Sequence, residues 1–586
     1  MRPALSAFRK LAFRRLFAKL AALKNLAGQL LLRSRYPLAI VAGLALAAAF
    51  LEINLAGLAW VGPALILGAA WGRSGGDAFR IGYVAGLAHY LASLYWLLLI
   101  PVTGYPILGW VALSAYLALY PAAWVWLLSG KVGVGGWAQR TAWSLGGAAV
   151  WVGLEMVVGR FLSGFPWNFI GTSQYRMLPL IQIASVAGVY GVSFVVVWFS
   201  LCMYSAVVAI LRRPTARYAW MAEIILPLIV LAALFVFGLG RLREQTPPGP
   251  TLRVTFVQPS IPQTMIWDEK ENANRFRQLL ALTARALTNE TDLLLWPEAA
   301  VPNMIRYDEA TYRAITGLAR SNHVWMIVGS DDAVHRVSST NPNEADYFNS
   351  SFLVTPTGKL DGVYHKRHLV IFGEYVPLAR WLPFVKWFTP ITGGFTPGDR
   401  LVSFEMNQWP RIAPQPQPGL HEAPPELAPR QVVKTATLIC FEDVFPHLVR
   451  EDVNDDTDFL VNLTNDGWFG EGAEQWQHAA SAVFRAVENG LPLARCCNNG
   501  LTCWIDSCGR LREIFHDKSG SVYGAGIITA QIPVLAPGEK RKPTFYNEHG
   551  DWFGWTCVGM TALVALTSLK PKSEMVGSSR RDDPAP

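Results

Sequence analysis

The feature that most constrains this chain is the uneven distribution of charge along it. Hydrophobic residues make up 52% of the 586 residues and charged residues only 16%, whereas soluble domains usually carry about a quarter charged residues. Charge is sparse from 37 to 240 and frequent from 241 to 550. A chain of this length is also too long for one compact core. The pattern therefore predicts a membrane half followed by a globular half.

Seven apolar segments occupy the first half, each near or above the roughly 20 residues that cross a bilayer. They are 37–53, 55–72, 82–101, 106–129, 142–159, 180–211 and 222–240. An eighth segment, 552–569, follows the globular half. This arrangement predicts five regions: a cytoplasmic basic segment 1–36, a membrane domain 37–240, a globular domain 241–550, a membrane helix 551–570 and a cytoplasmic tail 571–586.

Basic residues support this topology, because the predicted inner loops carry them and the outer loops near 54 and 102–106 do not. Arg160 and Arg176 are exceptions on the outer side, and lipid phosphate is one candidate partner. Much of the +8 net charge lies in segment 1–36, so a nucleic-acid partner is not indicated. That segment is either an amphipathic helix on an anionic leaflet or a partly disordered tail.

Two ionisable residues, His89 and Glu155, lie inside predicted spans. Ionisable groups at that depth are functional candidates, although both are also compatible with satisfied polar groups inside the helix bundle. In the globular half, apolar strand patterns alternate with helix patterns, which predicts an α/β layered domain. Segment 410–429 is proline-rich and predicts a solvated loop. An aromatic, glycine-ended loop near 381–398 predicts a lid at the bilayer interface, with candidates Trp381, Phe384, Trp387 and Phe388.

Three chemically capable residues stand at the ends of predicted strands: Glu298, Lys366 and Cys440. A thiol must lose its proton to become a nucleophile, a desolvated carboxylate can take that proton, and an ammonium can hold an oxyanion. The backbone N–H of Phe441 is also placed to help. Taken singly, each residue has a structural explanation: a buried packing thiol, a turn glutamate and a surface lysine.

The order of motifs makes the interpretation specific. Trp296-Pro297-Glu298, then 365–370 with Phe372-Gly373-Glu374, then Cys440-Phe441-Glu442 resembles the nitrilase/amidase (carbon–nitrogen hydrolase) superfamily over about 252–535. Seven spans before such a domain and one after it, together with Gly-Phe-Pro-Trp at 164–167, resemble the apolipoprotein N-acyltransferase family over nearly the whole chain.

That resemblance implies a multi-span helical membrane domain joined to an αββα nitrilase-like sandwich. It implies Glu298, Lys366 and Cys440 as the catalytic triad, with Glu374 as a second glutamate near the thiol and Glu442 and Trp267 in supporting positions. Phe441 departs from the tyrosine that is common after the cysteine, so a backbone N–H role survives and a hydroxyl role does not. No metal or organic cofactor is implied.

The implied activity transfers a fatty acyl chain from a membrane phospholipid, through a thioester on Cys440, to the N-terminal amine of a diacylated apolipoprotein. The implied protein is a monomer in the bacterial inner membrane with its catalytic domain on the periplasmic side. A membrane-anchored amidase or nitrilase-type hydrolase is the first alternative, and a transporter or lipid-binding protein with an inactive module is the second. A disulfide among Cys496, Cys497, Cys503 and Cys508 remains open.

Overall fold

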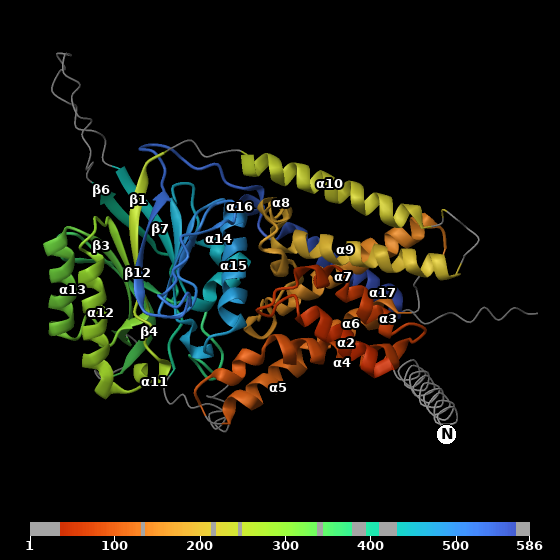
Figure 1. Cartoon of the computed structure of the whole chain (residues 1–586), viewed down its shortest axis with the longest axis horizontal. Coiled ribbons are helices and arrows are strands. Elements are labelled where there is room, and N and C mark those ends of the chain that lie inside the picture. The colour runs from red at the N-terminus through yellow and green to blue at the C-terminus, as the bar shows by residue number, and fades with distance from the viewer. Residues whose placement is uncertain are drawn as a thin grey trace, which may run out of the picture.

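The computed structural model describes residues 35–569, apart from 103, 130–134, 213–217, 219, 244–248, 337–343, 378–393 and 409–430. The proposed lid residues Trp381, Phe384, Trp387 and Phe388 lie outside the described residues, as do the proline-rich insert, most of the basic segment and the C-terminal tail. Figure 1 shows a helical half, which includes the C-terminal helix α17, beside an α/β half.

The helical half is built from short and long helices. Their bounds are α2 (Arg35–Ala47), η1 (Ala56–Trp60), α3 (Gly62–Ala69), α4 (Gly75–Ser93), η2 (Tyr95–Leu99), α5 (Tyr105–Leu117), α6 (Leu119–Leu128), α7 (Trp137–Val158), η3 (Phe161–Ser163), η4 (Ile170–Gln174), α8 (Leu178–Ile181), α9 (Ala184–Arg212), α10 (Met221–Arg243) and α17 (Trp552–Leu569). Among the described residues, four segments are long and apolar enough to cross a membrane: Tyr105–Leu128, α7, α9 and α10.

The remaining predicted spans form shorter or interrupted helices. Segment 55–72 becomes η1 and α3, with Pro63 in the first turn of α3, where a proline suits a helix start. The segment predicted over 180–211 begins with α8 and continues as α9, which has a non-helical residue at Gly188. The predicted count of eight spans therefore stays a prediction, while a multi-helix apolar half is confirmed.

The α/β half contains two six-stranded sheets. The first has the order β12-β1-β2-β3-β4-β5 and the second β11-β10-β9-β8-β7-β6. The strands are β1 (Thr251–Gln258), β2 (Leu293–Val301), β3 (Trp325–His335), β4 (Ala345–Val354), β5 (Leu360–His365), β6 (Ser403–Gln408), β7 (Gln431–Ile439), β8 (Phe459–Thr464), β9 (Leu493–Cys497), β10 (Cys503–Ile505), β11 (Leu511–Arg512) and β12 (Gly526–Pro533). Strands and helices alternate along much of this half, as the sequence pattern predicted.

Helices cover the outer face of each sheet, which confirms the predicted αββα sandwich (Figure 1). Apolar residues of α12 (Asn272–Ala286) and α13 (Glu309–Asn322) pack on the first sheet. A second apolar core lies between the sheets and joins β1 and β2 to β7, β8 and β9. On the far side, α14 (Pro446–Glu451) and α15 (Ala473–Asn489) form the fourth layer.

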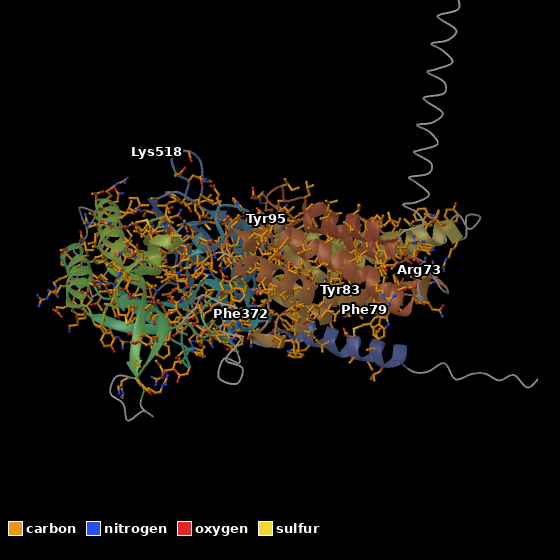
Figure 2. The ribbon with its side chains drawn as sticks, turned by 90° about the horizontal axis from the view of Figure 1, so that it is seen from below. Arg73, Phe79, Tyr83, Tyr95, Phe372 and Lys518 are labelled. Atoms are coloured by element: carbon orange, nitrogen blue, oxygen red, sulfur yellow. The ribbon has the colours of Figure 1, made fainter. Side chains whose placement is uncertain are left out.

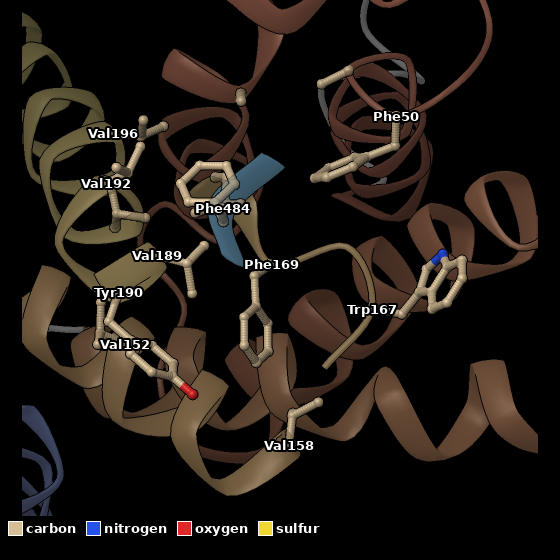
Figure 3. Packing of buried hydrophobic residues seen from close by; sticks show 14 of the residues in the cluster. Phe50, Val152, Val158, Trp167, Phe169, Val189, Tyr190, Val192, Val196 and Phe484 are labelled. Carbon is tan, nitrogen blue, oxygen red and sulfur yellow. The ribbon is translucent and has the colours of Figure 1, made fainter. Parts of the chain in front are cut away.

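Helix α15 belongs to both halves of the molecule. It packs against α9 of the helical half as well as against β9 and β10. Every residue of α15 except Trp476 is buried, although a helix in the outer layer of a soluble sandwich normally keeps a polar face in water. Figure 3 shows Phe484 of α15 among Val189, Val192 and Val196 of α9. The α/β half is thus docked on the helical half through a continuous apolar core.

Candidate active site

Glu298 is positioned by an irregular stretch of β2. The pairing of β2 with β3 shifts register between Trp296 and Val301, and Ala299 has φ +51°, a conformation that costs energy for a residue with a side chain. The irregularity lies beside Glu298, whose side chain is buried. The carboxylate Oε1 accepts a hydrogen bond from Asn349 Nδ2 at 2.7 Å, and Oε2 makes no hydrogen bond within the described residues.

Lys366 lies directly after β5 and reaches two glutamates. Its Nζ is 3.3 Å from Glu298 Oε1 and 2.8 Å from Glu374 Oε1, and its side chain is 1% exposed. Asn349 Nδ2 also donates to Glu374 Oε1 at 2.8 Å. We call Glu298, Asn349, Lys366 and Glu374 the lysine cluster. It brings three residues predicted from the sequence into one contact network and adds Asn349, which the sequence analysis missed.

Cys440 begins the short helix η7 (Cys440–Val444) at the end of β7. Its φ is +50°, in the left-handed region that residues with a Cβ rarely adopt. Such strain is typical of functional turns that project a nucleophile from a strand end. Asn462 Nδ2 donates to the Cys440 carbonyl at 3.2 Å, which helps to hold this turn.

The electrostatics of the site favour a protonated thiol at rest. Burial and the charge of Glu298 raise the pKa of Cys440 well above its ordinary value, and Lys366 only partly opposes them. Burial also raises the pKa of Glu298. For Lys366, burial lowers the pKa, but the Glu374 and Glu298 carboxylates outweigh burial and raise it. Lys366 therefore stays charged, and the thiol needs a base to lose its proton.

Glu442 joins the nucleophile turn to the lysine loop. Its carboxylate accepts hydrogen bonds from the backbone N–H of Ile439 at 2.7 Å and of Arg367 at 2.7 Å. The Tyr364 hydroxyl, at 2.9 Å, and the His368 N–H, at 3.1 Å, also donate to it. Glu442 is fully buried. It touches the residues before Cys440 and after Lys366, so it positions both and is not placed to react.

The other predicted supporting residues lie differently. The Phe441 ring stacks on Trp167 of the Gly-Phe-Pro-Trp motif, with ring centroids 6.0 Å apart. Trp167 in turn lies beside His478, at 5.4 Å. Trp267 is 44% exposed and makes an edge contact with Trp468, at 5.1 Å. Among the described residues, no hydrogen bond, ion pair or ring contact joins Trp267 to the lysine cluster or Cys440, so its supporting role stays a prediction.

A second buried charge network lies on the second sheet. His478 places Nε2 2.8 Å from Asp443 Oδ1 and Nδ1 3.0 Å from Asp466 Oδ1. Arg495 donates to Asp443 Oδ2 at 3.1 Å and to Asp466 Oδ2 at 2.8 Å. We call Asp443, Asp466, His478 and Arg495 the histidine cluster. Asn462 connects it to the nucleophile turn, because its amide donates to Asp443 as well as to Cys440.

The histidine cluster neutralises itself. Burial and Arg495 lower the pKa of His478, but Asp443 and Asp466 outweigh them and raise it to about 10. Burial raises the pKa of Asp466, but Arg495 and His478 outweigh it and lower it to about 2. Two carboxylates thus face two cations. Burial and then the Asp466 charge raise the pKa of the adjacent Glu474 well above its ordinary value.

These residues fit an ion-pair network better than a metal centre. Ligand-type atoms of Asp466, Glu474 and His478 lie within 4.8 Å of one another, a spacing that a cation could bridge. However, Arg495 Nη2 lies 2.8 Å from Asp466 Oδ2 and 2.9 Å from His478 Nδ1. Arg495 therefore already occupies the Asp466 and His478 atoms that a metal ion would need as ligands.

The ionisable residues inside predicted spans do not reach the site. Glu155 Oε1 accepts hydrogen bonds from Trp151 Nε1 at 3.0 Å and from the Ile170 N–H at 2.8 Å. His89 lies against the rings of Phe50 and Tyr90. Both side chains are buried in the helical half.

The sequence analysis left open a disulfide among the cysteines of the α/β half. In the structure all seven cysteines are free thiols.

Known proteins resemble both halves of the chain. Residues 253–534 match the carbon-nitrogen hydrolase family, and residues 42–202 match the apolipoprotein N-acyltransferase N-terminal domain. An apolipoprotein N-acyltransferase from Geobacter metallireducens is 34% identical over 92% of this chain and 96% of its own length. The corresponding Chlorobaculum tepidum protein is 27% identical over 92% of this chain and 98% of its own.

A solved structure of an amidase from a Nesterenkonia species is 17% identical and covers 49% of this chain and 91% of its own, with a TM-score of 0.32.

Proposed function

Because the chain belongs to the apolipoprotein N-acyltransferase family, we propose that it moves a fatty acyl group from a membrane phospholipid to the N-terminal amine of a diacylglyceryl-cysteine lipoprotein. The acyl group travels as a thioester on Cys440. The family and the nitrilase-like fold support an enzyme of lipoprotein N-acylation. The phospholipid donor, the thioester and the residue roles are the proposal. We place the protein in the bacterial inner membrane as a monomer, with the catalytic domain on the periplasmic side.

In the first half-reaction the Glu298 carboxylate takes the Cys440 proton while the sulfur attacks the ester carbonyl of the phospholipid. The Lys366 ammonium and the Phe441 N–H stabilise the oxyanion that forms. The carbon–oxygen ester bond then breaks. Glu298 returns its proton to the departing oxygen, which leaves as the hydroxyl of a lysophospholipid. Cys440 carries the acyl group as a thioester.

In the second half-reaction the neutral α-amine of the acceptor attacks the thioester carbonyl. Glu298 takes a proton from the attacking nitrogen, and the carbon–sulfur bond breaks as the amide forms. The thiolate then recovers the proton from Glu298, so the enzyme ends in its resting state. Lys366 serves both half-reactions without losing its charge, which agrees with its raised pKa.

The observation that carries the proposal is the contact between Lys366 and both Glu298 and Glu374 beside a strained, half-buried cysteine. The same residues also suit a hydrolase, which would release the acyl group to water. The attachment of the α/β half to an apolar helical half through α15 favours lipid substrates over soluble amides. The predicted lid, outside the described residues, would protect the thioester from water.

The test is intact-mass measurement of the purified protein after incubation with phospholipid vesicles. We expect a gain of one fatty acyl group that is removed by hydroxylamine and by a diacylated lipopeptide, but only slowly by water. The Cys440→Ala variant should gain nothing. Rapid discharge by water alone would favour the hydrolase. No adduct on a free, reduced thiol would overturn the proposal and favour a binding or transport protein.

A further inference from the structure

The two arginines predicted to lie on the outer side have different surroundings. Arg160 follows α7 and forms an ion pair with Asp551, while its guanidinium lies 5.3 Å from the Trp555 ring. Its charge is therefore neutralised inside the protein. For Arg176, no carboxylate in the described part of the chain lies within the 4.0 Å of an ion pair. This second arginine is exposed and retains its charge for an outside partner.

Arg176 is nevertheless held in place. Its Nε donates to the Tyr175 hydroxyl at 2.8 Å. Its guanidinium carbon lies 5.3 Å from the ring centres of both Tyr175 and Trp476, distances at which cation–π attraction acts. Among the described residues, its two terminal nitrogens have no hydrogen-bond acceptor. A fixed guanidinium with free terminal N–H groups is suited to bind a phosphate through two oxygens.

Arg176 lines a pocket that also contains an acidic residue. The pocket measures about 40 Å³ and lies where the connection after α2, the turn η4 and helix α15 meet. Glu52 is on its wall, and Glu52 Oε1 accepts a hydrogen bond from the Tyr95 hydroxyl at 2.9 Å. Tyr95 is itself tied to the start of α15, because its oxygen accepts the Ala473 N–H at 3.2 Å. We call this site the junction pocket.

The location and size of the junction pocket restrict its ligand. Figure 2 shows Tyr95 where the membrane helices meet the α/β half, the level at which lipid headgroups would lie. A space of about 40 Å³ holds roughly three water molecules, so it suits a headgroup fragment and is too small for an acyl chain. None of Glu298, Lys366 and Cys440 lines it, so it is separate from the candidate active site.

We propose that the junction pocket binds the headgroup of a phospholipid that carries both a phosphodiester and a primary ammonium. Arg176 binds the phosphate, and Glu52 accepts hydrogen bonds from the ammonium. The opposite charges of Arg176 and Glu52 match such a zwitterion. A headgroup that has a phosphate but no ammonium would leave the Glu52 carboxylate without a cationic partner. The site would hold one lipid at the junction of the two halves, whether or not that lipid is also an acyl donor.

The test is lipid retention by the full chain, measured by native mass spectrometry after exchange into micelles that contain either a phosphoethanolamine lipid or a phosphoglycerol lipid with the same acyl chains. A Cys440→Ala background prevents turnover, so the result does not depend on the proposed reaction. We expect the unsubstituted pocket to retain the phosphoethanolamine lipid preferentially. Arg176→Gln should weaken that retention about tenfold or more, and Glu52→Gln should remove the preference between the two lipids.

The matched control is Arg73→Gln, because Arg73 is also exposed and lies at the end of the helical half far from the α/β half (Figure 2). This variant should retain lipid as the parent protein does. Equal retention by the parent, Arg176→Gln and Glu52→Gln proteins would overturn the proposal. Displacement of the lipid by millimolar inorganic phosphate alone would also overturn it, because that result would identify a simple anion site.

Discussion

The lysine cluster and the histidine cluster approach Cys440 from different sheets, and both are buried, but their charges are arranged differently. In the lysine cluster two carboxylates face one ammonium, and Glu298 Oε2 has no hydrogen bond within the described residues. In the histidine cluster two carboxylates face two cations. A buried site with more carboxylates than cations can exchange a proton, whereas a site with equal numbers of the two resists proton exchange. We therefore assign chemistry to the first cluster and support to the second.

The largest expected effect is the loss of acylation rate when the proposed general base, Glu298, is replaced. Glu298→Gln keeps the shape of the side chain and the contact with Asn349 but removes the proton acceptor. We expect the rate of acyl-enzyme formation to fall by about 10³-fold or more, the range for loss of general acid–base catalysis. Rapid-quench mass measurement of the acyl adduct checks this, and the melting temperature should stay close to that of the parent. An unchanged acylation rate would show that another group takes the thiol proton.

A slightly smaller effect is expected from Lys366→Met, which replaces the ammonium with a neutral chain of similar length. The oxyanion loses a charged donor, and we expect acyl-enzyme formation to slow by about 10²- to 10³-fold. The same assay measures it. A matched control is Lys434→Met, because Lys434 forms its ion pairs with Glu405 and Asp456 at the protein surface. Equal losses in the two variants would contradict a specific role for Lys366.

The histidine cluster should respond in stability instead of rate. Asp443→Asn leaves His478 and Arg495 with one carboxylate between them, and breaking a buried ion pair in this way costs about 3 kcal/mol or more. We expect a lower thermal unfolding temperature in detergent, with the acylation rate of the folded fraction within about threefold of the parent.

The control for that variant is Asp506→Asn, which removes a partner of the more exposed Arg510 and Arg512. Such exposed pairs contribute up to about 1 kcal/mol, so its unfolding temperature should change little. A large rate loss in folded Asp443→Asn protein would show that the histidine cluster takes part in catalysis, and the contrast between the two clusters would be wrong.

An intermediate test sharpens the lysine cluster. Asn349→Ala removes the amide that donates to both Glu298 and Glu374. Hydrogen bonds to charged groups contribute about 1.5–3 kcal/mol, so we expect the acylation rate to fall by about 10- to 100-fold. The pH–rate profile should also shift to higher pH, because the Glu298 carboxylate loses a hydrogen bond that favours its charged form. A rate loss without that shift would indicate a packing effect only.

The histidine cluster also predicts a pH dependence of stability. The pKa of His478 is raised in the folded protein, from an ordinary 6.5 to about 10. The proton is therefore bound more tightly in the folded state, and this stabilisation is complete below pH 6.5 and lost as the pH rises toward 10. Thermal melts between pH 6.5 and 10 should show a decline that is weaker in His478→Gln. Parallel curves for the two proteins would contradict a charged His478.

The sequence predicted the lysine cluster better than the histidine cluster for a physical reason. Lys366 and Cys440 directly follow strands, as predicted, whereas Glu298 lies inside β2 at its irregularity and not at a strand end. The motif order of the three residues resembles a known family. Asn349 lies in the polar stretch 349–351 of β4, which has no strand signal of its own, and Arg495 lies inside the short apolar strand β9. One signal was available, because an arginine within a buried strand such as β9 needs carboxylate partners. Which carboxylates it meets depends on packing between β7, β8 and α15, and a single sequence does not give it.

Fold class was similarly accessible, while some pairings were not. Alternating strand and helix patterns predicted the α/β half. Strand β12 pairs antiparallel with β1 although nearly the whole domain separates them, so no local pattern identifies that pairing. In the helical half, apolar length alone predicted uniform spans. Pro63 at the start of α3 and the positive-φ Gly188 within α9 interrupt two of these predicted spans.

The burial of α15 limits how the molecule can be divided. A cut at residue 241 looks natural in the sequence, since charge becomes frequent there. Yet the separated α/β half would present to water the side of α15 that now lies against α9, including Phe484. A large newly exposed apolar face favours aggregation. The catalytic half should therefore resist preparation as a soluble fragment, and inhibitors or substrates need to be assayed on the full chain in a lipid or detergent environment.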